Sequence, residues 1–247
     1  MSLLSVTRRG DGRPFVWLHG FTQTRDSAQR FRTILAETFE LWTLDLPGHG
    51  TASAVTASLD EAADLIVGVL PDEAIDLGGY SLGGRVALHV AIRHPERIGR
   101  LVLVSATRGI RDDAERAQRR RRDDALAEHI LEVGTAAFLD EWLAQPLFST
   151  LPDDPVERAA RSRDAAGLAA SLRTLGTGTQ EWLGDRLAVT GLPTMAIAGA
   201  LDAKFTAEAQ AIADADASRA ALVGGAGHAT HLEEPQECAE LVSGFLA

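Results

Sequence analysis

Short hydrophobic runs alternate along the chain with stretches whose apolar side chains recur every three or four residues. The runs, which predict buried strands, lie at 14–19, 39–44, 74–77, 100–105, 193–199 and 219–223. The amphipathic stretches predict helices at about 26–38, after a capping box at 58–61, at 82–94 and at about 235–245. Because the strands are continuous apolar runs that alternate with helices, the pattern predicts a parallel sheet covered on both faces.

This alternation stops at about Gly109 and resumes at Pro193. The stretch between them contains helical patterns, acidic and arginine pairs, and proline breakers, but no convincing strand. We therefore expect an α/β core made of residues 1–108 and 191–247. We expect an α-helical lid, residues 109–190, to be inserted into that core.

Composition narrows the class of protein. The 247 residues carry a net charge of −11, which argues against a nucleic-acid partner because phosphate binding requires a basic face. The single cysteine, Cys238, excludes an intramolecular disulfide and suits a reducing compartment. The first ten residues contain no apolar signal segment, and no apolar run approaches the roughly 20 residues that span a bilayer. We expect a cytoplasmic protein without a membrane span, either a monomer or a small homo-oligomer.

The stretch Gly79-Tyr80-Ser81-Leu82-Gly83 lies between a predicted strand and a predicted helix. Gly-x-Ser-x-Gly in that context is typical of the nucleophile elbow of the α/β-hydrolase fold. The turn is so sharp that the serine backbone is strained, and the two glycines allow neighbouring main chain to approach. The pattern predicts that Ser81 acts as a nucleophile or a base. The alternative is a glycine-rich turn with a serine that caps a helix.

A serine of this kind needs a base and a carboxylate that orients the base. In this fold the order along the chain is serine, then acid, then histidine. Asp202 follows the strand at 193–199, and His228 ends a glycine-rich loop after the last strand. We therefore expect Ser81, Asp202 and His228 to form a triad. His231, three residues further on, is the competing candidate for the base.

The stretch His19-Gly20-Phe21 follows the first predicted strand. In this fold an oxyanion hole takes one backbone N–H from such a loop and one from the residue after the serine. We expect the N–H groups of Phe21 and Leu82 to fill these roles. Lys204, the only lysine, lies two residues after Asp202 and is either a positive charge near the site or a solvated helix start. No Cys, His or carboxylate spacing indicates a metal ligand set, so we expect no metal.

The chain resembles the 2-succinyl-6-hydroxy-2,4-cyclohexadiene-1-carboxylate synthases of menaquinone biosynthesis. The elbow carries the tyrosine before Ser81 and the arginine four residues after it that this family shows. Further similar stretches, several of them in the expected lid, lie at 115–127, 142–148, 168–173, 176–180, 202–205 and 227–235. Lid sequences diverge among hydrolases, so the lid stretches discriminate best.

The resemblance implies a lyase without a cofactor. Such an enzyme eliminates pyruvate from a succinylated cyclohexene with three carboxylates, and Ser81 acts as a base. Arg85, Arg119 and Arg161 are the implied partners of the carboxylates on this small anionic substrate, and Tyr80 and Trp142 are implied to line the pocket. The alternatives are a serine esterase or C–C hydrolase and, from another class, a ligand-binding protein without catalysis.

Overall fold

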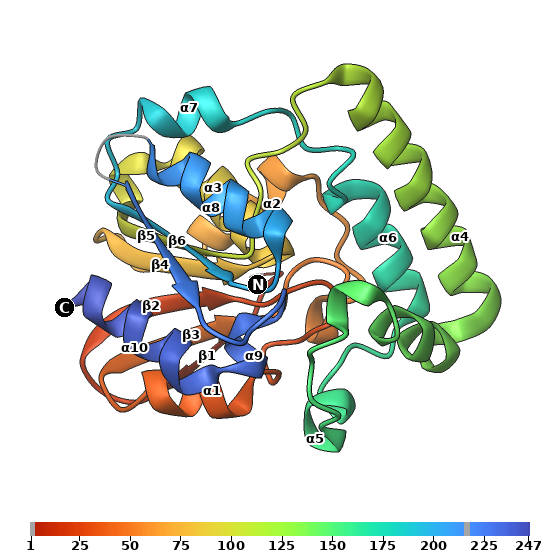
Figure 1. Ribbon diagram of the computed structural model, residues 1–247, viewed down its shortest axis with the longest axis horizontal. Coiled ribbons are helices and arrows are strands. Elements are labelled where there is room, and N and C mark those ends of the chain that lie inside the picture. The colour runs from red at the N-terminus through yellow and green to blue at the C-terminus, as the bar shows by residue number, and fades with distance from the viewer. Residues whose placement is uncertain (1–2, 215–217) are drawn as a thin grey trace.

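Seven strands form one mixed sheet in the order β1-β3-β2-β4-β5-β6-β7 (Figure 1). The computed structural model describes residues 3–214 and 218–247. The strands are β1 (Val6–Arg9), β2 (Arg13–Leu18), β3 (Phe39–Leu44), β4 (Ile75–Tyr80), β5 (Ile98–Val104), β6 (Thr194–Gly199) and β7 (Ser218–Val223). Only β1 pairs antiparallel to its neighbour, and β2 to β7 are parallel. The carboxyl ends of six strands therefore share one edge.

Two layers of helices cover the sheet (Figure 1). On one face, α1 (Gln29–Leu35) and α10 (Pro235–Leu246) bury Phe31, Leu35 and Val242 against the strands. On the other face lie α2 (Leu59–Val67), α3 (Leu82–Arg93) and α8 (Ala203–Ala213), whose apolar sides form a second buried cluster with the sheet. The short α9 (Thr230–Glu233) precedes α10. Because helices cover both faces of the sheet, the apolar side chains of its strands are buried on both sides, as the sequence pattern predicts.

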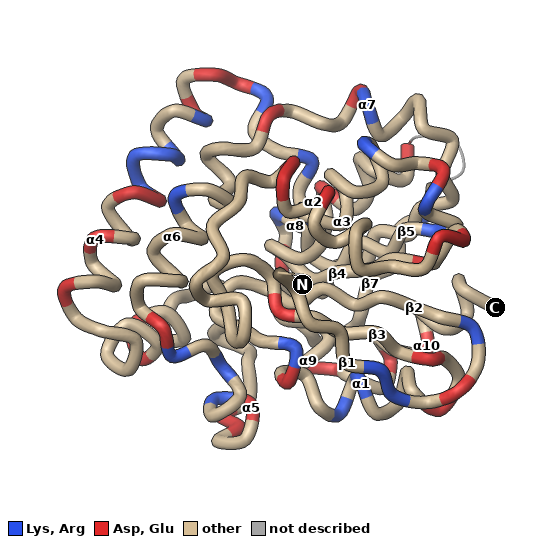
Figure 2. Tube along the Cα trace, turned by 180° about the vertical axis from the view of Figure 1, so that it is seen from behind, with Lys and Arg blue, Asp and Glu red and all other residues tan. Residues whose placement is uncertain are grey.

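The chain between β5 and β6 consists of helices joined by loops and contains no strand. Its helices are α4 (Asp113–Leu143), α5 (Pro155–Ala159), α6 (Ala165–Leu175) and α7 (Gly184–Ala188), with a 3₁₀ turn at Pro146–Phe148. Gly134 has a φ of 77° and breaks α4 into two helical parts. α4 and α6 lie side by side at one end of the molecule and share an apolar cluster of their own (Figures 1 and 2). Leu183 and Leu187 belong to the core cluster, so the last part of the segment packs on the sheet layer.

Two observed elements differ from what the sequence pattern predicts. The sequence pattern missed β1, because this edge strand is mostly exposed and carries polar side chains instead of an apolar run. The helix predicted at about 26–38 is shorter, since α1 begins at Gln29 and ends at Leu35. Ala28 precedes it with a φ of 57°, a left-handed conformation that cannot continue a helix backwards. Residues 19–28 are thereby released to form a loop at the carboxyl edge of the sheet.

Candidate active site

Ser81 occupies the sharp turn between β4 and α3. Its backbone has φ 51° and ψ −106°, the strained conformation that the elbow motif predicts. A Cβ at Gly79 would lie 2.4 Å from the carbonyl carbon of Gly83, and one at Gly83 would lie 2.1 Å from the Leu18 carbonyl oxygen. Only glycine fits at both positions. The turn places the serine hydroxyl at the N-terminus of α3, where the helix dipole favours negative charge.

The three residues of the predicted triad lie in contact. His228 Nε2 is 3.4 Å from Ser81 Oγ, and His228 Nδ1 is 3.0 Å from Asp202 Oδ2. Because a carboxylate only accepts, Nδ1 carries the proton and Nε2 is free to accept from the serine hydroxyl. Burial raises the pKa of Asp202, but the hydrogen bonds from His228 and the Phe205 N–H outweigh it and hold that pKa below its usual value. The geometry can remove a proton from Ser81.

The loop after β2 presents the Phe21 N–H in a fixed direction. The Gly20 carbonyl accepts from the Gln23 N–H at 3.1 Å and from His19 Nδ1 at 2.9 Å. His19 Nε2 accepts from the Leu46 N–H at 3.0 Å, so the proton of this buried ring is on Nδ1. In a trans peptide the Phe21 N–H then points away from both donors. Among the described residues, neither it nor the Leu82 N–H has a protein acceptor.

A cavity of about 880 Å³, counting its open mouth, lies in front of Ser81, between the elbow and the helical segment that joins β5 to β6. Three side chains on its wall are cationic, namely Arg85, Arg119 and Lys204. No Asp or Glu lies among the described residues that line it. The remaining lining residues are largely apolar and include Phe21, Leu147, Phe148, Leu172, Leu175 and Phe205. The charge of this wall suits an anionic ligand.

Two arginines, Arg85 and Arg119, lie near each other on the cavity wall. Burial, together with the nearby charge of Arg119, lowers the pKa of Arg85 to about 9. Arg85 Nη1 donates to Gln180 Oε1 at 3.3 Å, and Arg119 Nε donates to Asp123 Oδ1 at 2.7 Å. Asp123 pairs with Arg119, whereas Arg85 bonds a neutral amide, so Arg85 can still bind a ligand anion. The rest of the arginine run, 120–122, is exposed, because adjacent helical residues face different directions.

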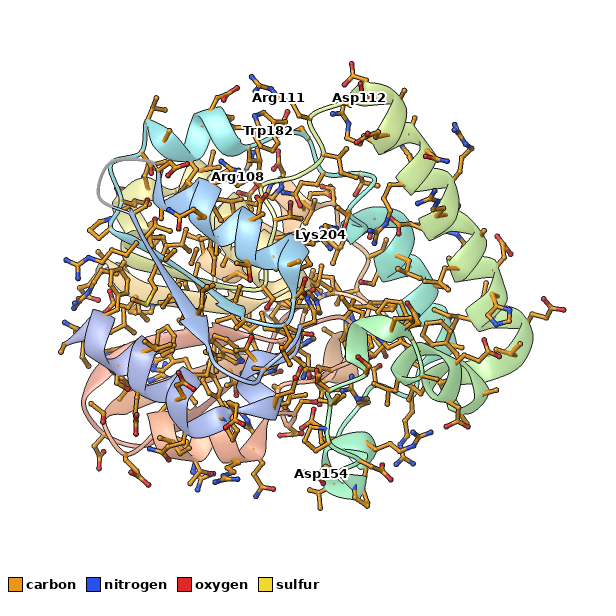
Figure 3. All side chains as sticks on the ribbon, in the orientation of Figure 1. Arg108, Arg111, Asp112, Asp154, Trp182 and Lys204 are labelled. Carbon is orange, nitrogen blue, oxygen red and sulfur yellow. The ribbon has the colours of Figure 1, made fainter. Side chains whose placement is uncertain are left out.

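The other predicted substrate-binding residues divide into two groups. Tyr80 and Trp142 line the cavity, and Trp142 also packs its ring 5.3 Å from that of Phe21. Arg161 does not line it. Its Nη1 donates instead to Thr22 Oγ1 at 2.6 Å, and the side chain lies in a neighbouring pocket. Lys204, labelled in Figure 3, is exposed at the start of α8 and lines the cavity, so both readings of it hold in part.

Sequence reasoning missed several polar residues on the cavity wall. Ser105, Thr107 and Ser171 line the cavity, and Gln180 holds Arg85. The Ser171 hydroxyl is buried without a hydrogen-bond partner. Ser171 and Gln180 fall in stretches that resemble the synthase family, but nothing in their local pattern distinguishes them from ordinary helix and loop residues. His231, the competing candidate for the base, hydrogen-bonds Gln23 through its Nε2, whereas the Ser81 hydroxyl is contacted by His228 Nε2.

Neither a metal site nor a membrane span is evident in the described part of the chain. Within residues 3–214 and 218–247, no group of three His, Cys, Asp or Glu side chains is arranged to hold a metal ion. No helix in the same residues has the length and apolar character needed to cross a bilayer.

Comparison with known proteins agrees with the fold. Residues 15–241 match the Alpha/beta hydrolase family. The chain is 34% identical to the 2-succinyl-6-hydroxy-2,4-cyclohexadiene-1-carboxylate synthase of Klebsiella pneumoniae (strain 342), with 100% of both chains covered. It is 31% identical to the Serratia proteamaculans (strain 568) protein of the same name, covering 100% of this chain and 98% of the relative. The structure of MenH from S. aureus superimposes with a TM-score of 0.90 at 31% identity, covering 100% of this chain and 98% of that one.

The fold, the serine at its elbow and the family match define the class: this protein is an α/β hydrolase in fold. Within that class the full-length relatives are more specific. The chain belongs to the 2-succinyl-6-hydroxy-2,4-cyclohexadiene-1-carboxylate synthase family and is an enzyme of that family.

Proposed function

We propose that this enzyme eliminates pyruvate from a succinylated cyclohexene tricarboxylate, the lyase reaction of menaquinone biosynthesis after which its relatives are named. One observation carries the proposal. The cavity in front of Ser81 has several basic side chains on its wall and no carboxylate among its described lining residues. A substrate with three carboxylates is the kind of ligand that such a wall attracts.

The proposed mechanism uses Ser81 as a base. His228, oriented by Asp202, takes the hydroxyl proton as Ser81 Oγ removes a proton from the substrate ring. Negative charge moves to the succinyl carbonyl oxygen, where the N–H groups of Phe21 and Leu82 stabilise it. As that charge returns, the bond between the ring carbon and the ether oxygen breaks. The departing three-carbon enolate takes the proton held by His228 and becomes pyruvate, which restores the neutral histidine. No bond forms between Ser81 and the substrate.

Arg85 and Arg119 are proposed to bind carboxylates, with Lys204 near the mouth of the cavity. Tyr80 and Trp142 are proposed to line the pocket. The role of Arg161 stays a prediction from the sequence, since its guanidinium group contacts Thr22 and not the cavity. The lid, residues 109–190, is proposed to contribute Arg119 and Trp142 to the site, while Arg85 comes from α3 of the core.

Pyruvate release from the succinylated precursor tests the proposal, measured by coupling to lactate dehydrogenase and NADH oxidation. The expected result is pyruvate formation that depends on Ser81. A serine esterase is the second candidate, because the same elbow and oxyanion N–H groups support an acyl-enzyme. A burst of p-nitrophenol from a simple ester, with no pyruvate from the precursor, would overturn the lyase and favour the esterase.

A further inference from the structure

A buried amide joins three parts of the molecule beside the cavity. Gln23 is 1% exposed, and its Oε1 accepts from the Gly20 N–H at 2.8 Å. Its Nε2 lies 3.2 Å from His231 Nε2 and 3.4 Å from Glu157 Oε1. Gly20 belongs to the loop that carries Phe21, His231 to α9, which directly follows the His228 loop, and Glu157 to α5 of the lid. The amide is a junction between segments that are distant in sequence.

The hydrogen-bond roles at this junction follow from the groups themselves. The Gly20 N–H only donates, so the Gln23 atom facing it is the carbonyl oxygen. The other end is the NH₂ group, whose two hydrogens suffice for both His231 and Glu157. His231 then accepts at Nε2 and carries its proton on Nδ1. Burial lowers the pKa of His231 to about 3, so this ring is neutral and able to accept.

The residues of this junction pack directly against Tyr80 at the elbow. The His231 ring centroid is 4.2 Å from that of Tyr80, the residue before Ser81. A Cβ on Gly20 would come within 2.5 Å of the same Tyr80 ring. The Phe21 loop and the His228 loop therefore both rest against Tyr80, and Gln23 is the side chain that links them. Gln23 is absent from the cavity wall, so it has no contact with a ligand there.

We propose that Gln23 is a positioning residue that holds the Gly20–Phe21 peptide and the His228 loop in fixed positions relative to Ser81. Glu157 links the lid to the same arrangement, because its other oxygen, Oε2, accepts from the Ala28 N–H at 2.6 Å. The inference rests on the proposed function, which assigns the Phe21 N–H to charge that develops in the transition state. An interaction of that kind affects kcat and leaves substrate binding unchanged.

The variant Gln23→Met tests this, because methionine has a similar length and removes the amide. We expect kcat for pyruvate release to fall by about 10- to 100-fold, with KM within about two-fold of wild type. Thr24→Val is the matched control. Thr24 lies on the same loop and donates from Oγ1 to the Ala160 carbonyl of the lid at 2.6 Å, but it contacts neither Gly20 nor His231. It is expected to lower the Tm and to keep the wild-type kcat.

A second measurement needs neither substrate nor variant. In the ¹⁵N NMR spectrum of the wild-type protein at pH 7, His231 should be a neutral ring protonated at Nδ1, with Nε2 as the acceptor. A ring protonated at Nε2 would overturn the inference, and so would an unchanged kcat in folded Gln23→Met. Wild-type protein that releases no pyruvate would instead overturn the proposed function, while the NMR result would still report on the Gln23–His231 hydrogen bond.

Discussion

His228 holds Ser81 at 3.4 Å through Nε2, a longer contact than the 3.0 Å between its Nδ1 and Asp202. The His228–Asp202 bond thus has an ordinary length, while the His228–Ser81 bond, to which the proposed mechanism assigns proton transfer, is at the long end of its range. Catalytic hydrogen bonds in free enzymes commonly tighten only when substrate binds. The proposed mechanism therefore requires the His228–Ser81 contact to shorten on substrate binding, whereas the His228–Asp202 contact needs no change.

The first prediction concerns these three residues as a unit. Ser81→Ala, Asp202→Asn and His228→Ala should each lower kcat by about 10³-fold or more, and the double variants should lose little beyond the single ones. His94→Ala is the control, since His94 lies at the end of α3 and hydrogen-bonds Asp64 at the exposed surface. Additive losses in the double variants would contradict a shared proton path.

The second prediction concerns the two arginines on the cavity wall. Arg85→Ala and Arg119→Ala should raise KM for the precursor by about 10- to 100-fold, because each removes a hydrogen bond to a charged group. Arg121→Ala is the matched control on the same helix, since Arg121 is exposed and does not line the cavity. Steady-state kinetics of pyruvate release give both constants. Unchanged KM values in both arginine variants would remove the proposed carboxylate contacts.

The third prediction uses a buried hydroxyl. Ser171 lines the cavity, and its buried hydroxyl lacks a protein partner, so we expect a substrate oxygen to accept its hydrogen bond when the site is occupied. Ser171→Ala should raise KM by about 2- to 10-fold while the Tm stays level or rises, because a buried polar group without a partner is removed. Ser162→Ala is the control: its hydroxyl is also buried and unpartnered but is not on the cavity wall. A lower Tm with an unchanged KM would show that Ser171 serves packing alone.

The fourth prediction is a loss of stability in acid. Burial lowers the pKa of His49 and of His231 to about 3, whereas both titrate near 6.5 when unfolded. The unfolded chain therefore binds more protons than the folded one between these values, and stability falls as the pH decreases from about 6.5 towards 3. Each histidine contributes a slope of up to about 1.4 kcal/mol per pH unit. Urea unfolding at pH 7, 5 and 4 measures it, and a stability that is flat over this range would refute the burial of neutral rings.

Much of the fold could be predicted because it depends on local patterns. Five of the six predicted apolar runs match observed strands to within two residues at each end, and the capping box at Ser58 and Glu61 is present. The elbow could also be predicted from the sequence, since Gly79 and Gly83 are required by close contacts that a short motif encodes. The edge strand β1 could not be predicted, because a mostly exposed strand has no hydrophobic run of its own.

The sequence by itself determined the layered core, the order of Ser81, Asp202 and His228 along the chain, and the helical segment with its run of arginines between β5 and β6. Only the tertiary structure decided which arginines reach the cavity: it placed Arg85 and Arg119 there and turned Arg161 towards Thr22. It also decided the contacts of Gln23, whose partners are 134 and 208 residues away along the chain. The physical reason is the same in each case. Strands, caps and elbows follow from neighbouring residues, whereas the direction of a long polar side chain depends on which distant segment packs beside it.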